Sequence, residues 1–262
     1  TATDSNNTAV GYNAGTAVTT GTSNTLLGTQ AGDALTTGSE NVAVGVQALS
    51  TEDAHGQNTA VGQQALRDLN AGATGNNTAV GHIAGRRMTT GTENTLIGAA
   101  AGDALTDADY NVALGARALG SDTLGSRSVA IGRSALESQN FTTATDTYNT
   151  AVGAFAGLEV TTGVRNTLVG ALAGDALTDA DYNVAVGYNA LTGDTLGSRS
   201  TAVGYKALQT QNLTTATDVY NTAVGFQAGI SVTTGVQNTI IGGLAGDALT
   251  TGSLTCVGYL SG

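Results

Sequence analysis

Short apolar runs recur along the chain at an almost constant interval, and each run ends on a glycine. Most steps between these glycines are 17 residues, with one of 19, two of 21 and one of 16. A 17-residue unit is too short for a helical pair or a propeller blade, but it fits one turn of a parallel β-solenoid. The pattern therefore predicts an all-β fold, a parallel β-solenoid of about 15 coils of ~17 residues. The glycines are Gly11, Gly28, Gly45, Gly62, Gly81, Gly98, Gly115, Gly132, Gly153, Gly170, Gly187, Gly204, Gly225, Gly242 and Gly258.

The elements expected within a coil follow from residue type. The Thr-Ala-Val core of the unit favours a short strand, because β-branched residues suit a pleated surface. The glycine that follows can take a positive φ where the chain bends sharply. Polar stretches such as 19–21 and 37–39 predict the turn on the opposite side of the coil.

A second, longer period groups the coils in fours. The residue four positions after the glycine is Gly in the first two coils of a set and Leu in the next two, as in Gly15, Gly32, Leu49 and Leu66. Each set spans 70 to 72 residues. We therefore expect one repeat domain over residues 1–262, built of four-coil blocks at approximately 1–70, 71–142 and 143–214 and a partial block at 215–262.

Both faces of the expected strands are apolar, as in Ala9-Val10 and Leu96-Ile97. Adjacent strand residues point to opposite faces, so one apolar face fills the coil and the other faces outward. A solitary solenoid would show polar residues on the outer face. The pattern therefore favours coverage by further copies of the chain, and closed cyclic symmetry would bury the same stripe in each copy.

An asparagine precedes most of these strands. Stacked in register, its amides predict a hydrogen-bonded ladder with a structural role. Ser128 and Ser200 take its place in two coils. The ladder residues are Asn7, Asn24, Asn41, Asn58, Asn77, Asn94, Asn111, Asn149, Asn166, Asn183, Asn221 and Asn238.

The unit Asn-Thr-Ala-Val-Gly-x-x-Ala, as at residues 7–14 and 221–228, resembles the head repeats of YadA-type trimeric autotransporter adhesins. It is similar also to repeats of phage tail-fibre-like proteins. The resemblance covers essentially the whole chain and implies a left-handed β-roll, a homotrimer and attachment to a host-cell surface receptor or glycan. It further implies an extracellular location, on a bacterial cell surface or in a virion fibre. The unit departs from the YadA type in its longer turns, and the chain contains no stalk, anchor or chaperone segment.

Composition and charge exclude several other classes. The net charge is −11 with nine Lys and Arg residues, which argues against nucleic acid and against anionic lipid. No apolar run approaches the ~20 residues of a membrane span, so no direct membrane insertion is expected. No signal peptide is visible at Thr1, which predicts a processed or excised segment. Cys256 is the only cysteine and forms no intrachain disulfide.

Residues suited to catalysis are few and scattered. His55 and His82 occupy unrelated positions of their coils, and neither has the spacing of a metal ligand pair. Cys256 lies many coils from His82, so a nucleophile–base pair is not expected. Lys206 is the only lysine, and no phosphate-binding loop surrounds it. The sequence therefore predicts a protein that is not an enzyme, with no catalytic residues, no metal and no cofactor.

Two aspartate clusters admit a calcium site or a simple polar turn. A calcium ion would need several converging oxygens, whereas an Asp-stabilised turn with a tyrosine packed over it needs none. The corresponding segments 36–39 and 250–253 read Thr-Thr-Gly-Ser and carry no acid, which favours the turn. The clusters are Asp103, Asp107 and Asp109, and Asp175, Asp179 and Asp181.

The longest coil connections, 137–148 and 209–220, interrupt the regular repeat, and residues 67–76 are their shorter counterpart. Solenoids often place binding surfaces on such insertions. One interpretation is contact with a receptor or glycan; the other, slightly favoured, is a loop that covers apolar surface of a neighbouring chain. The candidate contact residues are Phe141, Thr142, Thr143, Leu213, Thr214 and Thr215.

Together these patterns predict a non-enzymatic fibre segment, and the resemblance implies that it is trimeric and forms the shaft or head of a cell-surface adhesin or a phage tail fibre. The alternative is a stand-alone carbohydrate- or ice-binding β-solenoid. A regular polar rank on the exposed strand face would favour that alternative.

Overall fold

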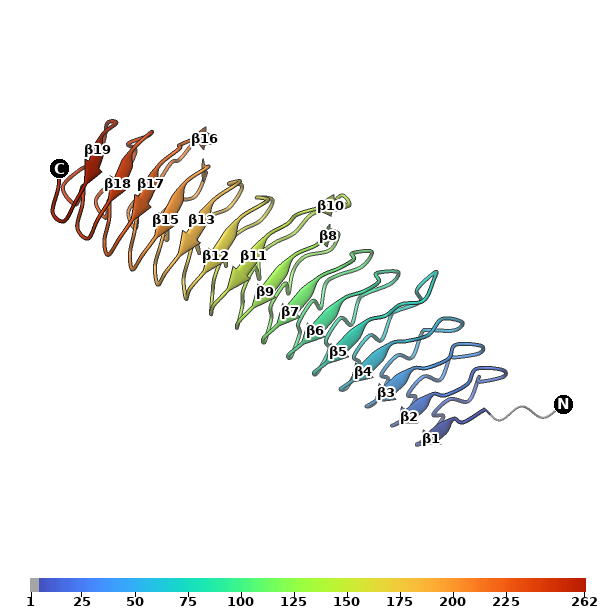
Figure 1. The fold of residues 1–262 in the computed structure, drawn as a ribbon. Helices are drawn as coiled ribbons and strands as arrows, with labels where there is room; N and C mark the ends of the chain where they lie inside the picture. The colour runs from blue at the N-terminus through green and yellow to red at the C-terminus, as the bar shows by residue number, and fades with distance from the viewer. Residues whose placement is uncertain (1–4) are drawn as a thin grey trace. The chain divides into compact units, whose positions relative to one another are not determined.

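The computed structural model describes residues 5–262. All secondary structure there is β, and every strand pairing within the two compact units described below is parallel (Figure 1). Each coil contributes one three-residue strand that pairs in register with the strands of neighbouring coils, as Val184 pairs with Thr201. The expected parallel β-solenoid of about 15 coils of ~17 residues is therefore confirmed.

The coils fall into two compact units. The first comprises residues 5–128 and 141–146, and the second comprises residues 129–140 and 147–262. The strands of the first are β1 (Thr8–Val10), β2 (Thr25–Leu27), β3 (Val42–Val44), β4 (Thr59–Val61), β5 (Thr78–Val80), β6 (Thr95–Ile97), β7 (Val112–Leu114), β8 (Gly125–Ser126) and β10 (Thr145–Asp146). Those of the second are β9 (Val129–Ile131), β11 (Thr150–Val152), β12 (Thr167–Val169), β13 (Val184–Val186), β14 (Gly197–Ser198), β15 (Thr201–Val203), β16 (Thr217–Asp218), β17 (Thr222–Val224), β18 (Thr239–Ile241) and β19 (Thr255–Val257).

Four residues in the left-handed or glycine region of φ bend each coil. In the coil of β13 they are Tyr182 before the strand and Gly187, Asn189 and Leu191 after it, with φ of 59°, 134°, 54° and 54°. The φ of Gly187 lies outside the range open to other residues, and a Cβ there would strike the carbonyl oxygen of Gly204 in the next coil. The unit glycine therefore permits both the bend and the close stacking of coils.

The four-coil period reflects complementary volumes in the core. In the coils with glycine at the fourth corner, long aliphatic side chains fill the interior: a Cβ at Gly174 would lie 2.8 Å from Leu168 Cδ2 and from Leu177 Cδ1. In the next coils the strand centre is alanine and the corner is a buried leucine, such as Leu191. Left-handed backbone costs a non-glycine residue about 1–3 kcal/mol, and burying a leucine gains about 1.5–3 kcal/mol. Burial therefore offsets the strain of leucine at this corner.

The asparagines before the strands bond to the backbone of the next coil through both the oxygen and the nitrogen of the amide, as Asn166 does. Asn166 Oδ1 accepts the backbone N–H of Asn183 at 2.9 Å, and Asn166 Nδ2 donates to the carbonyl of Ala180 at 2.7 Å. Direct amide–amide bonds also occur, as from Asn238 Nδ2 to Asn221 Oδ1 at 3.0 Å. These buried side chains satisfy backbone groups that the short strands leave unpaired.

Candidate functional site

The outer face of the strands carries one apolar column, which recurs in every coil of each unit. From β2 onward the centre of each three-residue strand, such as Ala185, points into the core, and the third residue points outward. In all fifteen coils that third residue is Val, Leu or Ile. Leu27, Val224 and Ile241 are 46%, 37% and 41% exposed, whereas most of the others, such as Val186, are half-buried. We call this column of third residues the apolar stripe.

Three aromatic rings stack at the edge of the apolar stripe in the second unit. Tyr188, Tyr205 and Phe226 directly follow the unit glycines of three successive coils. Their ring centroids are 5.8 Å and 5.2 Å apart, and their planes differ by 16° and 8°. All three remain exposed, so they extend the apolar surface beyond the strand itself.

The long connections fold back onto the solenoid. Phe141 and Leu213 are buried, with 6% and 7% exposure, whereas Thr142, Thr143, Thr214 and Thr215 face solvent. Beyond these residues each connection adds a two-residue strand: β10 pairs with β8, and β16 pairs with β14. Figure 1 shows β8 and β10 at the opposite end of the coil from β7. Each connection thus presents threonine hydroxyls around an apolar anchor.

Buried carboxylates hold these connections in place. Asp194 Oδ1 accepts the backbone N–H groups of Gly197 and Leu213, at 3.1 Å and 3.0 Å. Asp122 Oδ1 accepts the corresponding N–H groups of Gly125 and Phe141, both at 3.1 Å. Both side chains are fully buried. These residues were not predicted from the sequence, because a lone acid in a polar stretch looks like a solvated turn residue.

Gln211 extends this network and explains one break in the asparagine ladder. Its Nε2 donates to Asp194 Oδ2 and, at 3.0 Å, to the hydroxyl of Ser200. Its Oε1 accepts from Asn221 Nδ2 at 2.8 Å. The Gln211 side chain occupies the space that an asparagine side chain at position 200 would fill. This explains why the smaller Ser200 stands there. The serine at 128 and the glutamine at 139 repeat the same sequence combination one block earlier.

The aspartates considered for calcium bond separately to neighbouring coils. Asp107 Oδ1 accepts the Thr90 hydroxyl at 2.6 Å, and Asp109 Oδ1 accepts the Thr92 N–H at 2.7 Å. Asp103 forms an ion pair with Arg86 at 3.1 Å. These partners hold the carboxylates apart in individual turn contacts rather than around a common centre.

Asp175 lies in the second of these clusters and is partly buried. Burial raises the pKa of its carboxyl, and a hydrogen bond from the Thr192 hydroxyl opposes that rise. The charged form of Asp175 is therefore less favourable in the folded chain than in water.

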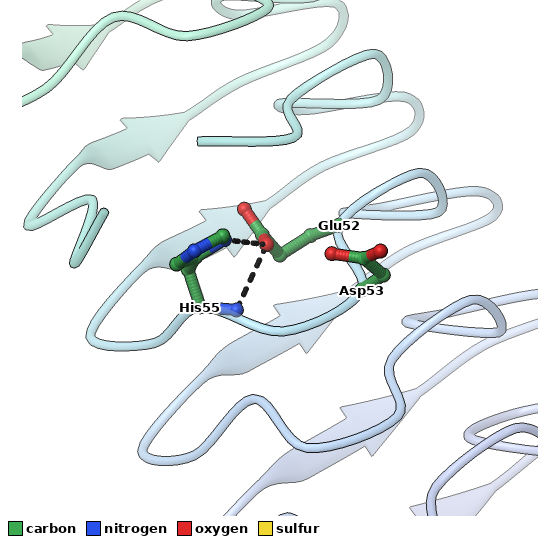
Figure 2. Close-up of side chains that lie close together, drawn as sticks. All are labelled: Glu52, Asp53 and His55. Atoms are coloured by element: carbon green, nitrogen blue, oxygen red, sulfur yellow. Dashed lines mark hydrogen bonds and ion pairs between the residues drawn. The ribbon is translucent and has the colours of Figure 1, made fainter. Parts of the chain in front are cut away.

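Among the described residues, only Glu52, Asp53 and His55 bring three potential metal ligands within 4.8 Å of one another. In Figure 2 dashed lines join Glu52 to the ring and to the backbone nitrogen of His55, and none reaches Asp53. Glu52 Oε1 accepts from His55 N at 3.0 Å and lies 3.2 Å from His55 Nδ1, while Oε2 accepts from Ala71 N at 3.1 Å. Both carboxylate oxygens are thus already bonded.

Glu52 is the first block's counterpart of the buried carboxylates Asp122 and Asp194, which hold the long connections in place. Glu52 bonds the backbone three and nineteen residues onward, as Asp122 and Asp194 do. Threonine occupies the position of Asp53 in the other two blocks, and glycine occupies that of His55. The arrangement therefore serves to hold a connection, and it gives no separate indication of a metal.

A pocket of about 300 Å³ opens beside His55. Its lining is polar except for Ala54 and the glycine, and it includes Glu40 and Gln57, which are joined by a hydrogen bond of 2.9 Å. Ligand pockets are usually lined mainly by apolar and aromatic side chains. The other singled-out residues lie apart from it: His82 is exposed after a unit glycine, and Cys256 is buried at the centre of β19.

Tyrosine and arginine also alternate in the residue that precedes the strand asparagine, or the serine that replaces it, and this alternation was not predicted from the sequence. The signal was present, since seven successive coils alternate strictly at this position. It becomes meaningful only when the coils stack and bring the side chains together. The residues are Tyr110, Arg127, Tyr148, Arg165, Tyr182, Arg199 and Tyr220.

No protein-family model matches the sequence, and no curated protein matches it. None of the described residues forms a helix long and apolar enough to cross a membrane.

Proposed function

We propose that the chain is a non-enzymatic β-roll fibre segment that assembles as a homotrimer and mediates attachment to a host-cell surface. The single observation that supports this proposal is the apolar stripe, which continues through every coil of both units. Contiguous exposed apolar surface on a soluble chain usually marks an interaction site.

Further copies of the same chain are the partner that suits this stripe. The stripe repeats at the coil interval, so an identical chain in parallel register meets it with the same residue type at every level. In some coils the residue beside the stripe is small, as at Ala154, Ala171 and Gly243, and leaves room for close approach; in three others the aromatic rings described above occupy this position. Cyclic symmetry would then bury the same stripe in each copy. The number three and the left-handed β-roll come from the resemblance to YadA-type adhesin heads and phage tail-fibre-like proteins.

The proposed location is extracellular, on a bacterial cell surface or in a virion fibre, and the proposed target is a host receptor or glycan. In this arrangement the solenoid is the constant scaffold. The threonine-bearing connections and the alternating tyrosines and arginines would provide varied side chains for contact with the target, outside the strand face.

Sedimentation equilibrium at micromolar concentration tests the assembly. The wild-type chain is expected to sediment at three times its monomer mass of 25.8 kDa. Val186→Lys with Val203→Lys should weaken the trimer, because each copy would bury unpaired charges in the same interface. Thr234→Lys, on an exposed turn of a regular coil and outside both the apolar stripe and the long connections, is the matched control and should leave the mass unchanged. A wild-type chain that stays monomeric would contradict the proposal.

A monomer would favour the stand-alone carbohydrate- or ice-binding solenoid instead. The outward first residue of the strand is threonine in most coils, which supplies a partial hydroxyl rank. Val42, Val112, Val129 and Val184 interrupt that rank, and the adjoining column is apolar throughout. The strand face thus supports self-association better than binding to ice.

A further inference from the structure

Within the second unit, the alternating tyrosines and arginines form an exposed column along the corner before the strands. In the second unit the column consists of Tyr148, Arg165, Tyr182, Arg199 and Tyr220 in five successive coils. Each has a positive φ between 52° and 65°, which bends the chain at this corner. We call these five residues the Tyr/Arg column.

Guanidinium groups lie between tyrosine rings along the column. The Cζ atom of Arg199 is 4.7 Å from the ring centroid of Tyr182 and 5.9 Å from that of Tyr220. Arg165 is 5.3 Å from the Tyr182 centroid and 5.9 Å from that of Tyr148. Its Nη1 also donates to the Tyr182 hydroxyl at 2.7 Å. Cation–π contacts therefore fix these side chains in relation to one another.

The column is ordered by these contacts and still open to solvent. Tyr148, Tyr182 and Tyr220 are 49%, 41% and 52% exposed, so the core does not account for them. Tyrosine and arginine are the residue types that most often dominate binding energy at recognition surfaces. Because their rotamers are already restrained, a ligand would lose little side-chain entropy on binding here.

One of the two arginines in the column, Arg199, is paired with a carboxylate. Arg199 Nε pairs with Asp218 Oδ1 at 2.9 Å, and the Tyr220 hydroxyl donates to Asp218 Oδ2 at 3.3 Å. This bond to Asp218 raises the pKa of Arg199. The chain as a whole carries −11, which disfavours a polyanion. Paired donors and acceptors beside apolar ring surface instead suit a ligand rich in hydroxyl groups.

The spacing of the column suits a linear ligand. Stacked strands lie ~4.8 Å apart, so equivalent tyrosines recur about every 9.6 Å along the stack. A polymer of sugar rings can repeat its contacts at such an interval. The apolar faces of its rings would contact tyrosine, and its hydroxyls would bond to guanidinium and carboxylate groups.

We propose that the Tyr/Arg column binds a linear, uncharged glycan that lies along the stacking direction. The proposal rests on the attachment role proposed above and specifies its ligand class. It also places the contact on the corner before the strands, outside the apolar stripe that self-association would cover.

Binding of the intact chain to immobilised hexasaccharides tests the column. The probes are hexamers of β-1,4-linked glucose, N-acetylglucosamine and mannose, with oligosialic acid as the charged comparison. At least one uncharged hexamer is expected to bind. Tyr182→Ala should weaken that binding about tenfold or more, as removal of a central anchor does. Arg199→Lys should weaken it as well, because an ammonium group lacks the planar stacking surface.

Tyr12→Ala is the matched control, since Tyr12 is an exposed tyrosine outside the column and should not affect binding. Failure of every uncharged hexamer to bind, binding of oligosialic acid alone, or unchanged affinity in Tyr182→Ala would overturn the proposal. So would a changed sedimentation mass in Tyr182→Ala, because the column would then be an interface between copies. If the wild-type chain is a monomer and still binds an uncharged hexamer, the proposed trimer is wrong and the proposed glycan site stands.

Discussion

Replacement of Asp194 by alanine tests whether buried carboxylates hold the long connections. Asp194 is fully buried and accepts the backbone N–H groups of Gly197 and Leu213. Its second oxygen accepts from Gln211. The substitution leaves these donors inside the solenoid without an acceptor, and alanine offers none in its place.

The expected loss follows from the two backbone donors. An unsatisfied buried donor costs about 1–3 kcal/mol, so Gly197 and Leu213 together predict a loss of about 2–6 kcal/mol. Asp194→Asn should cost less, because its amide oxygen can still accept both backbone N–H groups. Its amide nitrogen would then face Gln211 Nε2, so we expect a smaller but measurable loss.

Hydrogen exchange measured residue by residue is the suitable assay. Coils of a solenoid can open separately, so a single global transition is not assured. The amides of Gly197 and Leu213 should exchange faster in Asp194→Ala, and the melting temperature should fall. Asp179→Ala is the control, because Asp179 is an exposed acid with one hydrogen bond, from the Thr162 hydroxyl.

Equal stability of Asp194→Ala and Asp179→Ala, or unchanged exchange at Leu213, would refute the idea that Asp194 holds the long connection in place. The pair Gln211→Leu and Ser200→Asn provides an internal check, since the first block carries leucine and asparagine at these positions. Gln211→Leu alone should destabilise the chain, and Ser200→Asn should restore part of the loss. Additive effects would argue against the coupling.

Three further predictions concern backbone, charge and core. Gly187→Ala should cost about 3 kcal/mol or more of folding stability, because φ is 134° there and the Cβ would meet the next coil. Gly72→Ala, with open space around it, should be neutral or slightly stabilising. Denaturation followed by circular dichroism compares the two variants. Burial raises the folded-state pKa of Asp175, so the native chain binds more protons at this carboxyl than the unfolded chain does. The contribution of Asp175 to stability is therefore fully present below its unfolded pKa, and it is lost as pH rises through its folded pKa. Asp175→Asn should therefore gain melting temperature relative to wild type between about pH 4 and pH 7, and a constant difference would refute this. Leu168→Ala should cost about 2–5 kcal/mol, measured by the same denaturation, because Leu168 is fully buried between two glycine corners; a loss below about 1 kcal/mol would show that the core there is loosely packed.

The interval between glycines was enough to predict the architecture. A solenoid coil contacts only its neighbours, so its fold is encoded locally and repeats with the sequence. The short Thr-Ala-Val strands were predicted from residue type alone, and so was the positive φ of the unit glycine. The four-coil grouping was visible in the sequence, but its reason was not.

That reason depended on which side chains meet across coils. Leucine at a left-handed corner, as at Leu191, contradicts local preference and is explained only by burial in the space that glycine leaves elsewhere. Asp194 and Gln211 look like solvated turn residues until the 21-residue step between β15 and β17 folds the connection over them. The repeat interval can be read along the sequence, and it was enough to predict the coils and their strands. Burial and the pairing of polar groups depend on residues of neighbouring coils, so only the stacked structure could decide them.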